Sequence, residues 1–222
     1  MYHSVLPEKE IKEKNDLIVS KENLEKQLLY IKNYYKTIFF KDLEKNASLE
    51  NKLILTFDDG YYNNLQHVVP LLEKYELKAT IFIPTKLIHD DANHSFMSFK
   101  EIKDLNPDLI EIALHSHSHR NYAQISLQEA KEDLMENIRT LEKYEISFTK
   151  ILAYPYGKFP KQKKNEFFNM LENAGIIAAL RIGNNIDSYP WKNKYEIQRI
   201  DIKGSDNLPV FKWKLKLGKI RF

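Results

Sequence analysis

Cysteine is absent from this chain of 222 residues. Disulfide bonds and thiolate metal ligands are therefore excluded, and any metal site has to use His, Asp or Glu side chains. The sequence also lacks an apolar run of roughly 18 residues, and residues 1–16 offer no basic segment followed by an apolar stretch. We therefore expect no membrane span and no export signal. As written, the sequence predicts a cytoplasmic protein, or an extracytoplasmic one if the N-terminus is truncated.

Glycine and proline are scarce, with 6 and 8 residues, and neither sign of charge dominates. Hydrophobic residues make up 43% of the chain and charged residues 29%, which argues against a disordered or fibrous protein. At this length we expect a single catalytic domain over residues 1–222. The 34 basic and 31 acidic residues leave a net charge of only +3, so nucleic acid is not an expected partner.

The C-terminal stretch is an exception to this balance of charge. Residues 212–221 contain no acidic residue and five basic ones, namely Lys212, Lys214, Lys216, Lys219 and Arg221. Such a stretch is either a solvated basic helix face or a peripheral contact with an anionic membrane or a phosphorylated substrate.

Short apolar runs rich in β-branched and aromatic residues alternate with longer segments of helical periodicity. The expected strands cover residues 36–40, 53–57, 79–84, 110–114, 151–154, 176–180 and 197–201, with a stub at 2–5. A β-α-β-α order predicts parallel strands joined by helical crossovers, either closed as a (β/α) barrel or left open as a doubly wound sheet. Both architectures place the active site at the carboxyl ends of the strands.

Helix starts and stops support this order. Ser20 is an expected N-cap, Ser98 with Glu101 and Ser126 with Glu129 are expected capping boxes, and a helix over residues 161–174 should stop at Gly175.

Two adjacent carboxylates, Asp58 and Asp59, follow the strand expected at 53–57 and precede Gly60. Neighbouring side chains on an extended chain point in different directions, so one acid can bind a metal while the other faces a substrate. The alternative is an ordinary Asp-Gly turn.

Three histidines, His115, His117 and His119, directly follow the strand expected at 110–114. Core packing explains them poorly, because each buried imidazole would need its own hydrogen-bond partner. His115 and His119 are four residues apart, which brings both rings to one ion if the segment turns helically, and one carboxylate would complete a three-ligand site. A solvated histidine cluster is the alternative, and His117 is the expected bystander.

A third polar element, residues 153–157 (AYPYG), stands at the end of another apolar strand. Aromatic rings beside a polar site suit the apolar face of a sugar, and a backbone N–H in such a turn can stabilise an oxyanion.

These motifs together resemble the polysaccharide deacetylases, carbohydrate esterase family four. Residues 56–61 (TFDDGY) are similar to the family's first motif, residues 115–119 (HSHSH) to its second and residues 154–157 (YPYG) to its third. Residues 2–5, 19–23 and 78–82 also resemble members that act on poly-N-acetylglucosamine. The resemblance covers most of the chain and implies a deformed (β/α) barrel of seven or eight mostly parallel strands.

Carried over to this chain, the resemblance implies Asp58 as general base and Asp59, His115 and His119 as ligands of a divalent metal, usually zinc. Tyr156 would offer its backbone N–H to the oxyanion. The implied function is removal of N-acetyl groups from an amino sugar in a polysaccharide or glycan precursor during surface-glycan biosynthesis.

Two departures from the family pattern are visible. Ala153 stands where the third motif usually begins with an arginine that orients the base, so Arg199 or Arg181 would have to substitute. The usual late Leu-x-His motif, which supplies the catalytic acid, is missing, and no histidine follows His119. The poly-N-acetylglucosamine branch implies a permuted arrangement in which His3 takes that role; a histidine on a frayed N-terminal strand is the alternative.

Two other functions remain open from the sequence. One is a metal amidohydrolase acting on a non-sugar amide. The other is a non-catalytic glycan-binding protein of the same fold, which Ala153 and the missing late histidine favour and an intact Asp58 disfavours, because a pure binding site has little use for a base.

Overall fold

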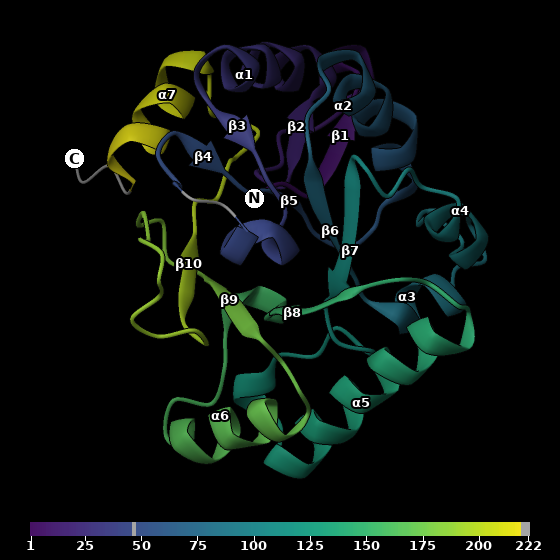
Figure 1. Cartoon of the computed structure of the whole chain (residues 1–222). Helices are drawn as coiled ribbons and strands as arrows, with labels where there is room; N and C mark the ends of the chain where they lie inside the picture. The colour runs from purple at the N-terminus through teal and green to yellow at the C-terminus, as the bar shows by residue number, and fades with distance from the viewer. Residues whose placement is uncertain (46–47, 219–222) are drawn as a thin grey trace.

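A computed structural model describes residues 1–45 and 48–218 of the chain. Its centre is a parallel sheet of six strands in the order β10-β9-β8-β7-β6-β5. The sheet curls about a central axis with the helices outside it, as Figure 1 shows. The strands are β5 (Leu55–Phe57), β6 (Ala79–Ile83), β7 (Ile110–Leu114), β8 (Thr149–Ala153), β9 (Ala178–Ile182) and β10 (Ile197–Arg199). This arrangement confirms the deformed (β/α) barrel, with six strands in the main sheet where seven or eight strands were expected.

Two short parallel pairs flank this sheet. They are β1 (Ser4–Leu6) with β2 (Ile18–Ser20), and β3 (Lys36–Thr37) with β4 (Lys52–Leu53). The segment expected as a strand at 36–40 is extended only over its first two residues, because Phe40 opens a 3₁₀ turn and packs inside the barrel. The strand at 18–20 was not expected, since three residues directly before a helix carry almost no periodic signal.

The N-terminal residues lie in the seam between β5 and β10, the two edges of the sheet. The Tyr2 N–H donates to the Thr56 carbonyl at 2.9 Å, and the Tyr2 carbonyl accepts from the Asp58 N–H at 2.9 Å. On the other side, the Ile202 N–H donates to the Met1 carbonyl at 3.1 Å. Backbone hydrogen bonds therefore continue across the gap, and His3 is carried to the carboxyl end of β5.

Helices cover the outer face of the sheet (Figure 1). They are α1 (Lys21–Tyr34), α2 (Val69–Tyr75), α3 (Thr85–His89), α4 (Phe99–Lys103), α5 (Leu127–Lys143), α6 (Lys164–Asn173) and α7 (Leu208–Leu217). Single turns or short irregular helices occupy Glu8–Glu10, Phe40–Lys45, Asn64–Val68, Tyr122–Gln124 and Pro155–Gly157.

The helix signals are confirmed. The Ser20 side chain accepts from the Asn23 N–H at the start of α1, and α4 and α5 both carry complete capping boxes. Helix α6 begins at Lys164, three residues later than expected, and the chain leaves it through Gly175 at φ +75°.

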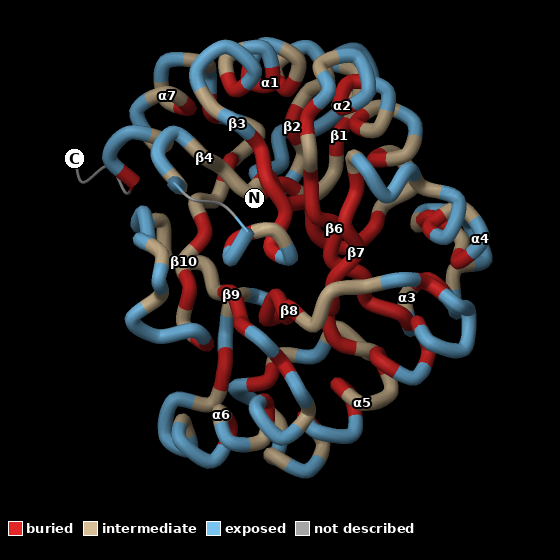
Figure 2. Tube along the Cα trace, in the orientation of Figure 1, coloured by how far each residue is buried: buried red, intermediate tan, exposed pale blue. Residues whose placement is uncertain are grey.

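The strands separate two apolar cores, because successive side chains point to opposite faces. The inner core fills the barrel with side chains such as Phe82, Ala113, Ala153 and Leu180, and the outer core lies between the strands and the helices. Figure 2 shows β5, β6 and β7 buried along their whole length, whereas β8 and β9 are each buried over three of their five residues. At the amino end of the barrel, the buried Glu111 carboxylate accepts from the backbone N–H groups of Phe40 and Lys41 and from the hydroxyls of Thr80 and Thr149.

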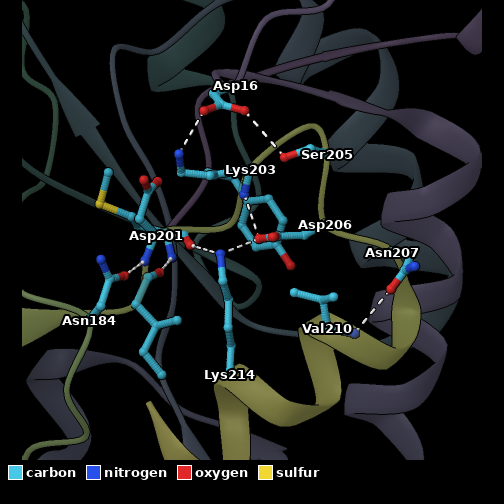
Figure 3. A network of polar contacts seen from close by, with 12 residues as sticks. Asp16, Asn184, Asp201, Lys203, Ser205, Asp206, Asn207, Val210 and Lys214 are labelled. Carbon is cyan, nitrogen blue, oxygen red and sulfur yellow. Dashed lines mark hydrogen bonds and ion pairs between the residues drawn. The ribbon is translucent and has the colours of Figure 1, made fainter. Parts of the chain in front are cut away.

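A polar network fastens the segment that follows β10 (Figure 3). Lys214 of α7 donates to the Asp201 carbonyl at 2.8 Å and pairs with the Asp206 carboxylate, while Lys203 pairs with Asp16 at 2.6 Å. One of the basic residues of the C-terminal stretch thus has a structural partner. Lys219 and Arg221 lie outside the described residues. In the part of the chain that the structure describes, no helix is long and apolar enough to span a membrane.

Candidate active site

Asp58 and Asp59 lie at the carboxyl end of β5, and both are buried, with exposures of 2% and 6%. The backbone that carries them is not extended, since Asp59 has φ +73° and Gly60 φ +65°, both in the left-handed region. A Cβ on Gly60 would approach Ile83 Cδ1 to 2.8 Å. The left-handed turn after Asp58 therefore requires glycine at this position and sends the two carboxylates into different surroundings.

The histidine segment leaves β7 as an irregular loop instead of the helical turn that the spacing suggested. Ser116 and His119 both have positive φ, +68° and +55°, and the Ser116 hydroxyl accepts from the His119 N–H at 2.9 Å. The buried Asp133 carboxylate of α5 accepts from the N–H groups of His117 and Ser118 at 3.0 and 2.9 Å. This clamp folds the loop so that His115 and His119 face the same point.

Asp59, His115 and His119 converge there. One potential ligand atom from each lies within 4.8 Å of the other two. Asp59 Oδ1 is 3.4 Å from His115 Nε2 and 3.2 Å from His119 Nε2, yet in the described part of the chain this buried oxygen has no hydrogen-bond partner. His115 Nδ1 donates to the Ala153 carbonyl at 2.8 Å, so the Nε2 of a neutral ring presents its lone pair to the cluster. Two nitrogens and an unpartnered buried carboxylate oxygen fit a divalent cation.

The charges of the cluster agree with this fit. Burial alone would raise the pKa of Asp59, but the close imidazoles of His115 and His119 outweigh burial and lower it. Burial would lower the pKa of His115, but the carboxylates of Asp58 and Asp59 outweigh burial and raise it. A cation bound at the cluster would likewise compensate the negative charge of the two carboxylates.

His117 lies outside the cluster, as expected for a bystander. Its Nδ1 contacts the Thr85 hydroxyl at 2.9 Å, and Asn137 of α5 donates to the same hydroxyl at 3.1 Å. Asp133, Asn137 and Thr85 were not singled out from the sequence. The available signal was Asp133 and Asn137, two polar residues one helical turn apart on the buried face of α5.

Of the two candidate arginines, Arg199 contacts Asp58. The guanidinium nitrogens of Arg199 donate to both Asp58 oxygens, at 2.6 and 2.7 Å, and its Cζ lies 5.3 Å from the centroid of the Phe82 ring. Arg181 follows Leu180, whose side chain belongs to the inner core, so Arg181 points to the opposite face of β9. Burial would raise the pKa of Asp58, but Arg199, His115 and His3 outweigh it and lower the pKa to about 2.

His3 and Tyr156 complete the surroundings. His3 Nε2 is 3.9 Å from Asp58 Oδ2, with only 13% of its side chain exposed, so this histidine is held in the site and is not frayed. Tyr156 is 59% exposed, has φ +58°, and its ring centroid is 5.1 Å from that of His119. A Cβ on the following Gly157 would approach the Ile182 backbone nitrogen to 2.7 Å, so the turn that presents Tyr156 depends on this glycine.

The fold has close counterparts among solved structures. The Streptococcus pyogenes deacetylase PplD in complex with acetate superposes with a TM-score of 0.83 at 19% identity, covering 99% of this chain and 96% of that one. A de-N-acetylase from Aggregatibacter actinomycetemcomitans gives a TM-score of 0.81 at 19% identity, covering 96% and 97%.

Curated sequences extend the comparison. A putative polysaccharide deacetylase, YxkH of Bacillus subtilis, is 27% identical over 168 residues, which is 73% of this chain but only 57% of that protein. The poly-beta-1,6-N-acetyl-D-glucosamine N-deacetylase of Staphylococcus aureus is 27% identical over 205 residues, covering 85% of this chain and 69% of that protein.

A family model described as polysaccharide deacetylase matches residues 45–177. The match includes Asp58, Asp59, His115 and His119. His3 and Arg199 lie outside the matched residues, and the fold brings both of them to Asp58. It covers more than half of the chain, and the motifs at the strand ends fall inside it. The chain belongs to the polysaccharide deacetylase family.

Proposed function

We propose that the protein is a zinc-dependent N-deacetylase that removes acetyl groups from N-acetylated amino sugars in a glycan. The observation that carries the proposal is one cluster at the carboxyl ends of the strands. It combines a three-ligand set with a second carboxylate, Asp58, that Arg199 keeps ionised. The family membership and the named activity of the staphylococcal relative support the same reaction.

In this proposal Asp59, His115 and His119 hold the metal. Their nitrogen and oxygen donors suit zinc, and three protein ligands leave positions open, as in catalytic sites. When bound, the ion would polarise the acetamide carbonyl and lower the pKa of a water molecule. The hydrogen bond from His115 to the Ala153 carbonyl fixes the ring before the ion arrives.

Asp58 acts as the general base and takes a proton from the attacking water. Its lowered pKa keeps it ionised across the physiological range. The paired hydrogen bonds from Arg199 fix the orientation of its carboxylate, so Arg199 is a positioning residue that replaces the arginine missing at Ala153.

His3 acts as the general acid and donates a proton to the leaving amine. Burial lowers its pKa below the ordinary value, and the carboxylate of Asp58 partly offsets that effect. The backbone N–H of Tyr156 stabilises the oxyanion formed from the acetamide, and its exposed ring offers a face for the sugar.

The test is acetate release from N-acetylglucosamine oligomers by the zinc-loaded protein. Asp58→Asn should retain zinc and lose turnover, whereas Asp59→Asn should lose zinc as well, which elemental analysis measures. If the zinc-loaded wild type releases no acetate from N-acetylated glycans, or if Asp58→Asn turns over normally, the proposal is wrong.

A further inference from the structure

A groove with an unbalanced charge runs beside the candidate site. Its volume is about 780 Å³, within the range of roughly 300–1,000 Å³ that is usual for ligand pockets. It lies between the turn after β8, the start of α5 and the outer face of β9. Four of its fourteen lining residues are cations, Lys158, Lys161, Lys163 and Arg181, and none is an acid. In the chain as a whole, basic and acidic residues are nearly equal at 34 and 31. The groove therefore concentrates positive charge that the overall composition does not predict.

These four cations have no carboxylate partner within the part of the chain that the structure describes. Two carboxylates of neighbouring elements are engaged elsewhere, since Glu129 at the start of α5 pairs with Arg120 and Glu196 pairs with Lys164. The three lysines are exposed and Arg181 is half-buried. Unpaired cations lining a concave surface produce a local positive potential that attracts anions.

The groove is continuous with the candidate site through Tyr156. This residue lines the groove, and the centroid of its ring lies 5.1 Å from that of His119 in the cluster of Asp59, His115 and His119. Apolar lining from Ile125, Leu127 and Phe159 accompanies the cations. A chain of sugars with one unit at the cluster can therefore place a neighbouring unit in the groove, with its apolar face on these side chains.

We propose that the groove binds an anionic unit of the substrate, so that the enzyme acts on a glycan carrying carboxylate or phosphate groups next to the N-acetylated sugar. This inference rests on the proposed deacetylase function and adds the charge of its substrate. A neutral homopolymer leaves the four cations uncompensated. The deacetylated product of a neutral homopolymer would interact unfavourably with the groove, because each new amine accepts a proton and is repelled by the cations. An anionic neighbouring unit is attracted to the groove both before and after the reaction.

The experiment compares three oligomers of similar length on the zinc-loaded protein. They are N-acetylchitohexaose, which is neutral, a hyaluronan hexasaccharide, which carries carboxylates, and an oligomer of N-acetylglucosamine 1-phosphate, which carries phosphodiesters. Acetate release gives kcat and KM at low and high salt. Calorimetric binding to the zinc-loaded Asp58→Asn protein provides a readout that needs no turnover.

The test variant replaces the four groove cations with glutamine: Lys158→Gln, Lys161→Gln, Lys163→Gln and Arg181→Gln. The control removes the same charge from exposed lysines elsewhere: Lys9→Gln, Lys12→Gln, Lys14→Gln and Lys26→Gln. An exposed ion pair changes an equilibrium by roughly two- to fivefold, so the loss of four such contacts should raise KM for an anionic oligomer by roughly tenfold to several hundredfold. The control variant and the neutral oligomer should change little, and high salt should reduce the difference.

If the hyaluronan oligomer shows this pattern, the groove binds carboxylate groups; if the phosphodiester oligomer shows it, the groove binds phosphate groups. Equal KM values for neutral and anionic oligomers, or an equal loss in test and control variants, would overturn the inference. Equally tight binding of a single-stranded DNA oligomer would also overturn it, by showing a groove without selectivity for glycans. Absence of acetate from all three oligomers would instead refute the deacetylase function, and the binding measurement would then decide the groove separately.

Discussion

Replacing Arg199 by methionine tests the most specific contact of the site. Arg199 and Asp58 form a buried pair with two parallel hydrogen bonds of 2.6 and 2.7 Å, and both side chains are more than nine-tenths buried. The substitution keeps the volume of the arginine stem but removes the charge that opposes the burial of Asp58.

The expected magnitude follows from this geometry. The lowering of the Asp58 pKa from 3.8 to about 2 corresponds to roughly 2 kcal/mol in favour of the ionised form. Removing one partner of a buried pair typically costs about 3–5 kcal/mol, because the remaining charge stays desolvated. We therefore expect Arg199→Met to lower the free energy of unfolding by about 3 kcal/mol or more near neutral pH, and kcat/KM by about 10²-fold.

The sign of the pH dependence is also fixed. In the wild type the pKa of Asp58 is lower in the folded than in the unfolded state, so its contribution to stability is complete above pH 3.8 and is lost as pH falls towards 2. In Arg199→Met burial dominates and raises the pKa of Asp58. The destabilisation should therefore be largest near neutral pH and smaller in acid, and the acidic limb of the rate profile should move to higher pH.

Urea unfolding from pH 4 to pH 8 at constant zinc measures the first effect, and the pH profile of kcat/KM measures the second. The double variant Asp58→Asn with Arg199→Met should recover much of the stability without activity, because neither charge of the pair remains. Arg199→Lys should fall between the two, since it keeps a cation without the paired geometry. An Arg199→Met protein with wild-type stability and an unshifted acidic limb would refute the reasoning.

Three further predictions follow from the site. His119→Ala should lose zinc while His117→Ala should largely keep it, as elemental analysis after dialysis would show; equal loss in both would mean that the ligand set is wrong. His3→Ala should lower kcat by roughly 10²- to 10⁴-fold without loss of zinc and should remove the high-pH limb of the rate profile, whereas wild-type turnover would exclude this acid. Gly157→Ala should disturb the turn at the site, since its Cβ would lie 2.7 Å from backbone, while Gly175→Ala, also at positive φ but 3.4 Å from a lysine side chain, should cost only the modest penalty of its conformation. Thermal unfolding and kcat together separate these two glycine variants, and equal effects would contradict the steric argument.

Short-range sequence patterns were sufficient to predict the helix starts and the positions of two motifs of the site. Capping at Ser20, Ser98 and Ser126 involves residues at most three positions apart, so the sequence alone carries it. The motifs at 58–59 and 115–119 follow strands directly, and parallel strands present their carboxyl ends at one edge, so their proximity was predictable as well.

The conformations within the motifs were less predictable. Asp58 and Asp59 diverge because of a left-handed residue and not because of an extended chain, and His115 and His119 meet through a loop clamped by Asp133 instead of a helical turn. Asp133 lies on another element, so no rule based on spacing could include it.

The sequence by itself determined the alternation of strands and helices, the metal-type ligands at strand ends and the family. Only the tertiary structure decided that Arg199 and not Arg181 contacts Asp58, that His3 reaches the site, and that cations from separate elements line one groove. The physical reason is distance along the chain. Arg199 and Asp58 are 141 residues apart and meet only because the sheet curls until its two edges face each other across residues 1–3.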